Sequence, residues 1–157
     1  MKNIPNNYLT AINAAILGGR EILKIIESGD FNTQIKSDNS PVTLADKNSS
    51  KKIIIELSKT GIPILSEEVL PPPFKVREKW TKLWIVDPLD GTKEFIKRTN
   101  NFCVNIGLVE NCNPTFGVIY IPITNTIYFG GKEVINGNMS KGTIAEFIIY
   151  INIQMSK

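Results

Sequence analysis

The 157-residue sequence contains no histidine. This absence excludes Ser-His-Asp and Cys-His catalysis, imidazole-ligated zinc and histidine acid–base chemistry. Cysteine is scarce as well: only Cys103 and Cys112 are present, their spacing fits no zinc motif, and we expect both to be reduced thiols. Any hydrolytic chemistry must therefore rest on carboxylates, hydroxyls, lysines, backbone groups or a metal-bound water.

Long hydrophobic runs and a strong net charge are also missing. The longest apolar stretch, residues 144–153, is interrupted by Glu146 and Asn152 and is much shorter than the roughly 20 residues that span a bilayer. The formal net charge is only +3, and lysine and arginine are dispersed along the chain. We expect a soluble protein with no secretory signal, no integral membrane segment and no nucleic-acid partner.

The apolar pattern of the first 60 residues predicts two helices. Apolar residues recur at near-helical spacing over residues 9–26, which indicates an amphipathic helix. A second helix is expected over residues 43–59, with Thr43 as its N-cap and with Ile54 and Leu57 facing inward. Both helices would pack on whatever the rest of the chain forms.

After residue 61 the pattern changes from helices to strands. Two short strands are expected at residues 62–65 and 82–86, and an antiparallel meander follows at residues 102–109, 115–121 and 126–130. Helices followed by an antiparallel sheet predict an α+β fold, with helices layered on the sheet, rather than a doubly wound nucleotide-binding fold.

Acidic residues follow both of the short strands. Glu67 and Glu68 come after the first, and the second runs into the segment from Asp87 to Asp90. Pro88 favours a type I turn, which would bring the Cα atoms of Asp87 and Asp90 within about 7 Å. If the two strands are neighbours in the sheet, Glu67 joins this pair. Two carboxylates about 4 Å apart repel by roughly 4 kcal/mol at an effective dielectric of 20, so a cation must offset the repulsion.

The expected cation is a hard divalent ion. Oxygen ligands without histidine favour Mg²⁺ over calcium, and we expect more than one ion. Such ions polarise phosphoryl oxygens and lower the pKa of a bound water. Asp-Pro and Asp-Gly are also ordinary turn dipeptides, so either alone would indicate little. Their combination behind an apolar strand, with acidic residues upstream, favours a metal site.

Glu67, together with the segment Asp87-Pro-Leu-Asp-Gly-Thr92, resembles the metal signature of the inositol monophosphatase superfamily. This superfamily contains magnesium-dependent phosphatases of inositol phosphates, sugar bisphosphates and phosphorylated nucleotides. The resemblance implies phosphomonoester hydrolysis. It also implies a set of metal ligands that consists of three carboxylates and one backbone carbonyl: Glu67, Asp87, Asp90 and the carbonyl of Leu89.

The same resemblance implies catalytic and substrate-binding roles. Glu67 and Thr92 would orient the attacking water, and Asp46 would support the Thr92 hydroxyl. At an expected helix start, backbone N–H groups would be offered to the phosphate. The residues implied to bind the substrate are Glu67, Leu89, Asp90, Gly91 and Thr92.

The flanking segments, residues 40–46, 65–68, 90–96 and 102–108, are similar to those of the CysQ-type 3′(2′),5′-bisphosphate nucleotidases. Inositol monophosphatases usually carry Thr-Asn-Phe where this chain has Lys93-Glu94-Phe95. The resemblance implies hydrolysis of adenosine 3′,5′-bisphosphate, a small phosphorylated nucleotide, to AMP and phosphate in sulfur assimilation. It also implies a cytoplasmic location, with peripheral association with the inner face of the membrane left open. An inositol or sugar phosphate is the alternative substrate.

The resemblance covers about residues 8–132. The family continues with a second α/β domain, which carries a further aspartate ligand in a Trp-Asp motif and most contacts to the nucleoside. Here both tryptophans precede Asp87, and no aspartate follows Asp90. We therefore expect residues 1–132 to form the N-terminal metal-binding domain of that fold and residues 133–157 to form an atypical tail. A truncated enzyme, a chain completed by a separate C-terminal domain, and a non-catalytic remnant all remain open.

Overall fold

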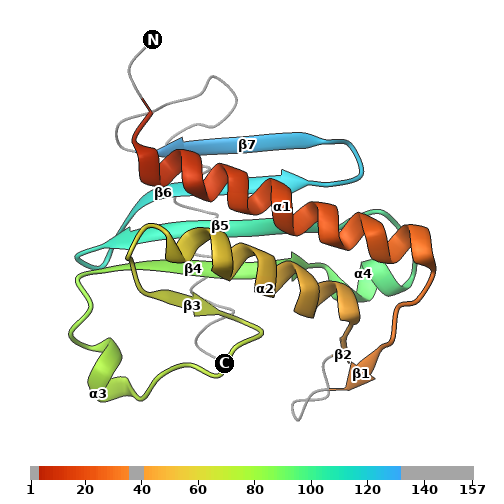
Figure 1. Ribbon diagram of the computed structural model, residues 1–157, viewed down its shortest axis with the longest axis horizontal. Helices are drawn as coiled ribbons and strands as arrows, with labels where there is room; N and C mark the ends of the chain where they lie inside the picture. The colour runs from red at the N-terminus through yellow and green to blue at the C-terminus, as the bar shows by residue number, and fades with distance from the viewer. Residues whose placement is uncertain (1–3, 36–40, 132–157) are drawn as a thin grey trace.

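Two helices cover one face of a five-stranded sheet (Figure 1). The structure is a computed structural model that describes residues 4–35 and 41–131. The main elements are helices α1 (Asn6–Ser28) and α2 (Leu44–Ser58), and strands β3 (Ile64–Ser66), β4 (Lys82–Asp90), β5 (Cys103–Glu110), β6 (Asn113–Ile121) and β7 (Thr126–Gly131). The smaller elements are strands β1 (Gln34–Ile35) and β2 (Pro41–Val42) and the short helices α3 (Phe74–Arg77) and α4 (Thr92–Ile96). The expected α+β fold is confirmed.

Both long helices begin or end at residues that favour a helix terminus. Gly29 has a φ of 71° and ends α1 in the left-handed conformation, which glycine adopts without steric cost. Thr43 is the N-cap of α2, as expected, and forms a reciprocal capping box with Asp46. The prediction for the inward face of α2 is partly wrong, because Ile53 rather than Ile54 is fully buried beside Leu57.

The buried face of α2 differs from the apolar stripe typical of a surface helix. Half of the buried residues on this face are polar. The polar ones are Asp46, Ser49 and Ser50, and the apolar ones are Ala45, Ile53 and Leu57. Buried polar groups of this kind are stable only when they form hydrogen bonds. All three have partners, and those partners lie on the strands and loops that carry the acidic residues.

The sheet has the strand order β3-β4-β5-β6-β7. The meander from β4 to β7 is antiparallel, as expected. Strand β3, however, pairs with β4 in parallel, so the expectation of a purely antiparallel sheet is wrong at this edge. Residues 67–81 connect the end of β3 to the beginning of β4, and a connection of this length permits the two strands to pair in parallel.

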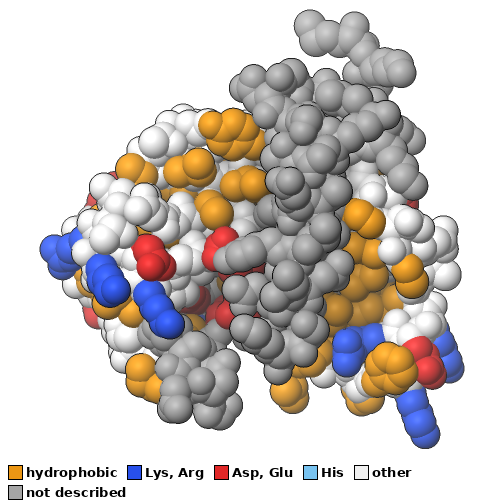
Figure 2. All heavy atoms as spheres, turned by 180° about the vertical axis from the view of Figure 1, so that it is seen from behind, with side chains coloured by type: hydrophobic (Ala, Val, Ile, Leu, Met, Phe, Trp, Pro, Cys, Tyr) orange, Lys and Arg blue, Asp and Glu red, His pale blue; other side chains and the backbone are white. Residues whose placement is uncertain are grey.

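Alternation along the strands divides the sheet into two faces. Trp84 and Val86 face the helices and belong to the main core, whereas Leu83 and Ile85 belong to a small second cluster on the opposite face. Figure 2 shows this rear face, where acidic side chains occur among apolar ones. The acidic residues at the end of β4 therefore lie on a different side of the sheet from the main core.

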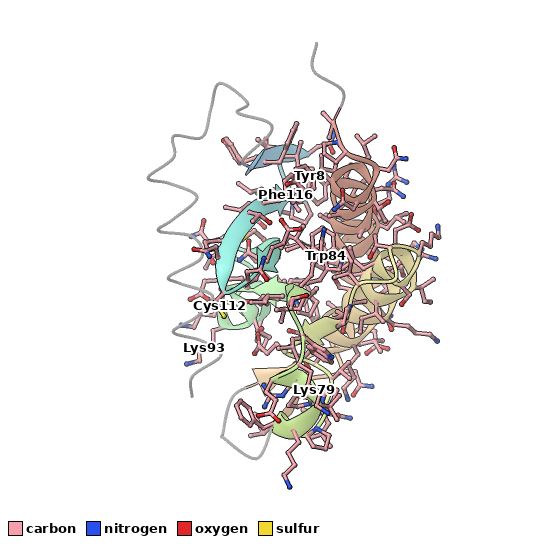
Figure 3. The ribbon with its side chains drawn as sticks, turned by 90° about the vertical axis from the view of Figure 1, so that its left-hand side faces the viewer. Tyr8, Lys79, Trp84, Lys93, Cys112 and Phe116 are labelled. Carbon is pink, nitrogen blue, oxygen red and sulfur yellow. The ribbon has the colours of Figure 1, made fainter. Side chains whose placement is uncertain are left out.

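An aromatic cluster fills the core between the helices and the sheet (Figure 3). Tyr8 of α1 stacks on Phe116 of β6, with ring centroids 4.1 Å apart, and Trp84 meets Phe116 edge-on at 6.5 Å. The indole N–H of Trp84 donates to the hydroxyl of Thr60 at 3.0 Å, so its burial leaves no polar group unsatisfied. This packing fixes β4, whose far end carries Asp87 and Asp90.

Three further expectations concern the cysteines, membrane-spanning helices and the C-terminal end of the sequence. Cys103 and Cys112 are free thiols, as expected. In the described ranges, no helix is long and apolar enough to cross a bilayer. The boundary expected at residue 132 and the tail expected at residues 133–157 lie outside the described residues.

Candidate functional site

The parallel pairing of β3 and β4 brings the predicted acidic residues together. Ser66 is opposite Val86 in the ladder, and the backbone N–H of Glu67 donates to the Val86 carbonyl at 3.1 Å. Glu67 therefore follows the end of β3 beside the part of β4 that carries Asp87. We use the term acid corner for Glu67, Asp87 and Asp90. The Glu67 side chain is exposed, whereas those of Asp87 and Asp90 are partly buried.

Asp87 and Asp90 are separated by a β-bulge and not by the type I turn that the sequence predicts. Strand β4 continues through Asp90, where Asp87 pairs with Asn105 and Asp90 pairs with Cys103. Three steps along β4 thus correspond to two steps along β5, so Pro88 and Leu89 together stand opposite the single residue Val104. Pro88 has no N–H to give to the ladder, so a bulge at this position is favourable.

Burial and neighbouring negative charges both raise the pKa of Asp87. Burial, followed by the charges of Glu67 and Asp90, raises the pKa of Asp87 to about 8, although the backbone N–H of Leu89 donates to its Oδ1 at 3.2 Å and opposes this rise. An opposite charge near a carboxylate has the reverse effect and favours the ionised form. The acid corner is therefore an environment that a cation would stabilise.

Asp90 is held by a residue that is not among those predicted for the site. The side-chain amide of Asn105 donates to Asp90 Oδ2 at 3.0 Å, and the Cys103 thiol lies 3.3 Å from Asn105 Oδ1. Burial, followed by the charges of Asp90 and Asp87, raises the pKa of Cys103 to about 12, so this thiol keeps its proton. The one signal in the sequence is a polar residue at position 105, in the middle of an apolar strand.

Asp46 and Thr92 meet, although they are distant in sequence. The Thr92 hydroxyl is 3.0 Å from Asp46 Oδ1 and 3.1 Å from the Leu89 carbonyl. A hydroxyl has one proton, so Thr92 donates to only one of these two acceptors at a time. Asp46 also accepts from the backbone N–H and the hydroxyl of Thr43, at 2.7 and 2.6 Å. Burial raises the pKa of Asp46 in spite of these hydrogen bonds.

Two further side chains of α2 reach the site and are not among the predicted residues. The Ser49 hydroxyl donates to the Pro88 carbonyl at 2.8 Å, inside the β4 bulge. The hydroxyls of Ser50 and Ser66 are 3.1 Å apart, next to Glu67. Serines in a helix usually face solvent, so only the folded arrangement reveals that these two face the acid corner.

The segment after Asp90 is shaped by Gly91. Its φ is 90°, and a Cβ at this position would lie 2.6 Å from the Asn101 carbonyl, so only glycine fits without movement of the backbone. Helix α4 then begins at Thr92, as expected. Lys93 is exposed and projects away from the core (Figure 3). An open hollow of about 410 Å³ adjoins Asp90 and is lined in part by Glu94, Cys103 and Ile119.

The donor set of the acid corner suits a hard divalent cation. Among the residues that the structure describes, no three His, Cys, Asp or Glu side chains lie close enough together to hold a metal ion as they stand. Mg²⁺ does not require such a cage, because it keeps several waters and uses one or two carboxylates together with substrate phosphates. The all-oxygen ligands and the raised pKa of Asp87 both fit this mode of binding.

A comparison with protein families matches residues 6–154 to the model described as the inositol monophosphatase family. Two curated relatives are both named 3′(2′),5′-bisphosphate nucleotidase CysQ. The protein from Salmonella typhimurium (strain LT2) is 48% identical over 100 residues, which are 62% of this chain and 40% of that protein. The protein from Buchnera aphidicola is 40% identical over 133 residues, which are 75% and 50% of the two chains.

Solved structures agree with this likeness. The crystal structure of CysQ from Bacteroides thetaiotaomicron superimposes with a TM-score of 0.70 at 43% identity, and the match covers 91% of this chain and 55% of that chain. The suhB protein of Bartonella henselae gives a TM-score of 0.71 at 30% identity, covering 79% and 48% of the two chains. This chain thus spans about half the length of the relatives that it matches.

Proposed function

Because the chain belongs to the inositol monophosphatase family, we propose that it acts in a magnesium-dependent phosphatase that hydrolyses adenosine 3′,5′-bisphosphate to AMP and phosphate. The observation that carries this proposal is the acid corner, where the pairing of β3 with β4 and the β4 bulge bring Glu67 and Asp90 near enough for their charges to act on Asp87. The choice of substrate rests on the 48% identity to a protein named 3′(2′),5′-bisphosphate nucleotidase.

In this proposal Glu67, Asp87, Asp90 and the Leu89 carbonyl hold Mg²⁺, with more than one ion bound. Bound Mg²⁺ polarises the phosphoryl group and lowers the pKa of a coordinated water. The protein contributes by placing the carboxylates of Asp87 and Asp90 toward the cation. Binding of the cation must displace the proton that the raised pKa of Asp87 favours at neutral pH.

Thr92 has the second role in the proposed mechanism. When its proton points to Asp46 Oδ1, the lone pairs of the hydroxyl are available to accept a hydrogen bond from the attacking water. Asp46 is itself fixed by two hydrogen bonds from Thr43, so it holds the Thr92 hydroxyl in this orientation. Glu67, the neighbouring carboxylate, completes the orientation of the water.

The substrate phosphate would contact Glu67, Leu89, Asp90, Gly91 and Thr92. Gly91 allows the backbone to turn sharply in front of α4, so that the N–H groups of Gly91 and Thr92 face the phosphate. Contacts to the nucleoside are proposed to come from a second domain, because the chain spans about half the length of its relatives. We propose a cytoplasmic location. The comparisons give no support for the peripheral membrane association.

Phosphate release with and without EDTA tests this proposal. Adenosine 3′,5′-bisphosphate, inositol 1-phosphate and a sugar phosphate would be compared, using the chain together with the second domain of a CysQ relative. We expect magnesium-dependent release, fastest from the nucleotide. Faster release from inositol 1-phosphate would replace the proposed substrate with the alternative, and metal binding without release from any substrate would favour a non-catalytic remnant.

A further inference from the structure

Two neutral hydrogen-bond donors approach the segment from Asp87 to Asp90 from opposite faces of the sheet: Ser49 contacts the Pro88 carbonyl, and Asn105 contacts Asp90. We propose that they are positioning residues, which hold Asp87 and Asp90 in the orientation that a divalent cation uses. Ser49 acts on Asp87 through one peptide unit, and Asn105 acts on Asp90 directly. This inference rests on the metal-binding part of the proposed function and adds two residues to it.

The action of Ser49 passes through the peptide unit that joins Pro88 to Leu89. The carbonyl of this unit accepts from the Ser49 hydroxyl at 2.8 Å, and its N–H donates to Asp87 Oδ1 at 3.2 Å. A peptide unit is planar, so its C=O and N–H directions are fixed relative to one another. Holding the carbonyl therefore also fixes the direction in which the N–H meets Asp87.

The sheet itself does not fix this peptide unit. The ladder with β5 has partners for Asp87 and Asp90 but passes over the two residues between them. Ser49 replaces the missing ladder contact from the helix side. Its hydroxyl is enclosed, because a Cβ at Gly18 of α1 would lie only 2.8 Å from Ser49 Oγ. The close approach of α1 thus restricts the Ser49 side chain to the bulge.

Asn105 holds the other aspartate from the rear face. It is directly opposite Asp87 in the ladder, and its amide nitrogen donates to Asp90 Oδ2 at 3.0 Å. The thiol of Cys103 donates to the amide oxygen at 3.3 Å, and this contact decides which end of the amide faces Asp90. Only 2% of the Asn105 surface is exposed, so its rotamer is fixed by packing.

Neutral donors suit this purpose better than lysine or arginine. A hydroxyl, an amide or a peptide N–H stabilises an ionised carboxylate through a hydrogen bond, yet brings no net charge to compete with the cation. Outer partners that orient metal ligands typically change metal affinity by about 10–100-fold when they are removed. Their loss should therefore weaken metal binding more than the loss of other buried hydrogen bonds does.

Matched variants separate positioning from general stability. Ser49→Ala and Asn105→Ala are each compared with Thr115→Val, which removes a buried hydroxyl bonded to the Leu108 carbonyl, away from the acid corner. The dissociation constants for Mg²⁺ and Mn²⁺ are measured by calorimetry on the full chain, at a temperature where every variant is folded.

We expect Ser49→Ala and Asn105→Ala to raise the dissociation constant about 10-fold or more, and the control to raise it less than about threefold. Equal weakening in a variant and its control would overturn the positioning role and leave a role in packing. If either alanine variant does not fold, Ser49→Cys or Asn105→Leu keeps the branching of the side chain, replaces the strong donor and gives the same comparison.

A metal-free measurement separates this inference from the proposed function. Hydrogen exchange of the Leu89 amide should be faster in Ser49→Ala than in Thr115→Val, because the peptide unit is no longer held against Asp87. The side-chain amide signal of Asn105 should shift in Asp90→Asn. Unchanged exchange and an unchanged signal would overturn the inference, whereas metal binding without phosphate release would count only against the proposed function.

Discussion

The hydroxyl of Thr92 lies 3.0 Å from Oδ1 of Asp46, a residue that is 46 positions earlier in the chain and on a different helix. This contact joins α2 to the segment that follows the β4 bulge. It places the Thr92 hydroxyl beside the acid corner, within hydrogen-bond distance of both Asp46 and the Leu89 carbonyl.

In an enzyme completed by a second domain, we expect Thr92→Ala to lower kcat about 100-fold or more with a much smaller change in KM. Orientation of the attacking water matters chiefly in the transition state, so its loss affects turnover more than substrate binding. Steady-state kinetics with adenosine 3′,5′-bisphosphate measures both constants. Thr92→Ser, which keeps the hydroxyl, should recover most of the rate. Unchanged turnover in Thr92→Ala would remove this residue from the mechanism.

Magnesium binding should depend strongly on Asp90. We expect Asp90→Asn to weaken binding measured by calorimetry, while Glu110→Gln leaves it unchanged, because Glu110 pairs with Lys82 at the other end of β4 and β5. Saturating metal should also raise Tm. At 100 times the dissociation constant the stabilisation is about 2.7 kcal/mol, which corresponds to roughly 5–10 °C in a chain of this size. Equal affinities in the two variants would refute the assignment of Asp90 as a ligand.

The stability of the metal-free chain should fall between about pH 4 and pH 8 because of Asp87. Its pKa in the folded chain is raised to about 8 from 3.8, so the folded state favours the protonated carboxyl. Below about pH 4 Asp87 is protonated in both the folded and the unfolded chain, so it does not change the free energy of unfolding. As the pH rises toward 8, Asp87 ionises first in the unfolded chain, which stabilises the unfolded chain relative to the folded one.

Asp87→Asn should reduce this loss of stability with pH and raise the metal-free Tm at pH 8, by roughly 2–4 °C for each kcal/mol recovered. The same substitution should abolish the stabilisation by Mg²⁺. Thermal unfolding at several pH values, with and without metal, measures both effects. A variant whose Tm falls as steeply with pH as that of the unsubstituted chain would show that Asp87 is not the responsible group.

The chain alone should have little phosphatase activity, even if it binds Mg²⁺. It spans about half the length of its relatives, and the hollow beside Asp90 is open to solvent, which weakens the charge interactions that the mechanism needs. Phosphate release by the purified chain would be compared with release after addition of a second domain from a CysQ relative. Rapid turnover by the chain alone would contradict this expectation.

The sequence predicts the elements of the fold better than their arrangement. The periods of apolar residues identify α1, α2 and the meander, because these depend on local pattern. From the sequence, adjacency of β3 and β4 is only a condition for Glu67 to join the aspartates, and their parallel direction is not predicted, since no local signal tells which distant strands are neighbours. The hairpin of β1 and β2 is too short to give a periodic pattern.

For the site, acidic residues near strand ends predict roles for Asp87 and Asp90, and family resemblance predicts roles for Asp46 and Thr92. Ser49 and Asn105 could not be found in this way, because their importance depends on contacts across 39 and 15 positions of the sequence. The bulge was also unforeseen. Asp-Pro suggests a turn by its local preference, but pairing with β5 extends the strand through Asp90.

The parallel pairing at the edge of the sheet also determines when the site forms during folding. Strands β5, β6 and β7 are joined by short loops, so their pairing closes small loops and can form early. The pairing of β3 with β4 closes a longer loop, and Glu67 reaches Asp87 only when that pairing is made. The acid corner is thus completed late, and a cation that binds it should slow unfolding while leaving the folding rate almost unchanged.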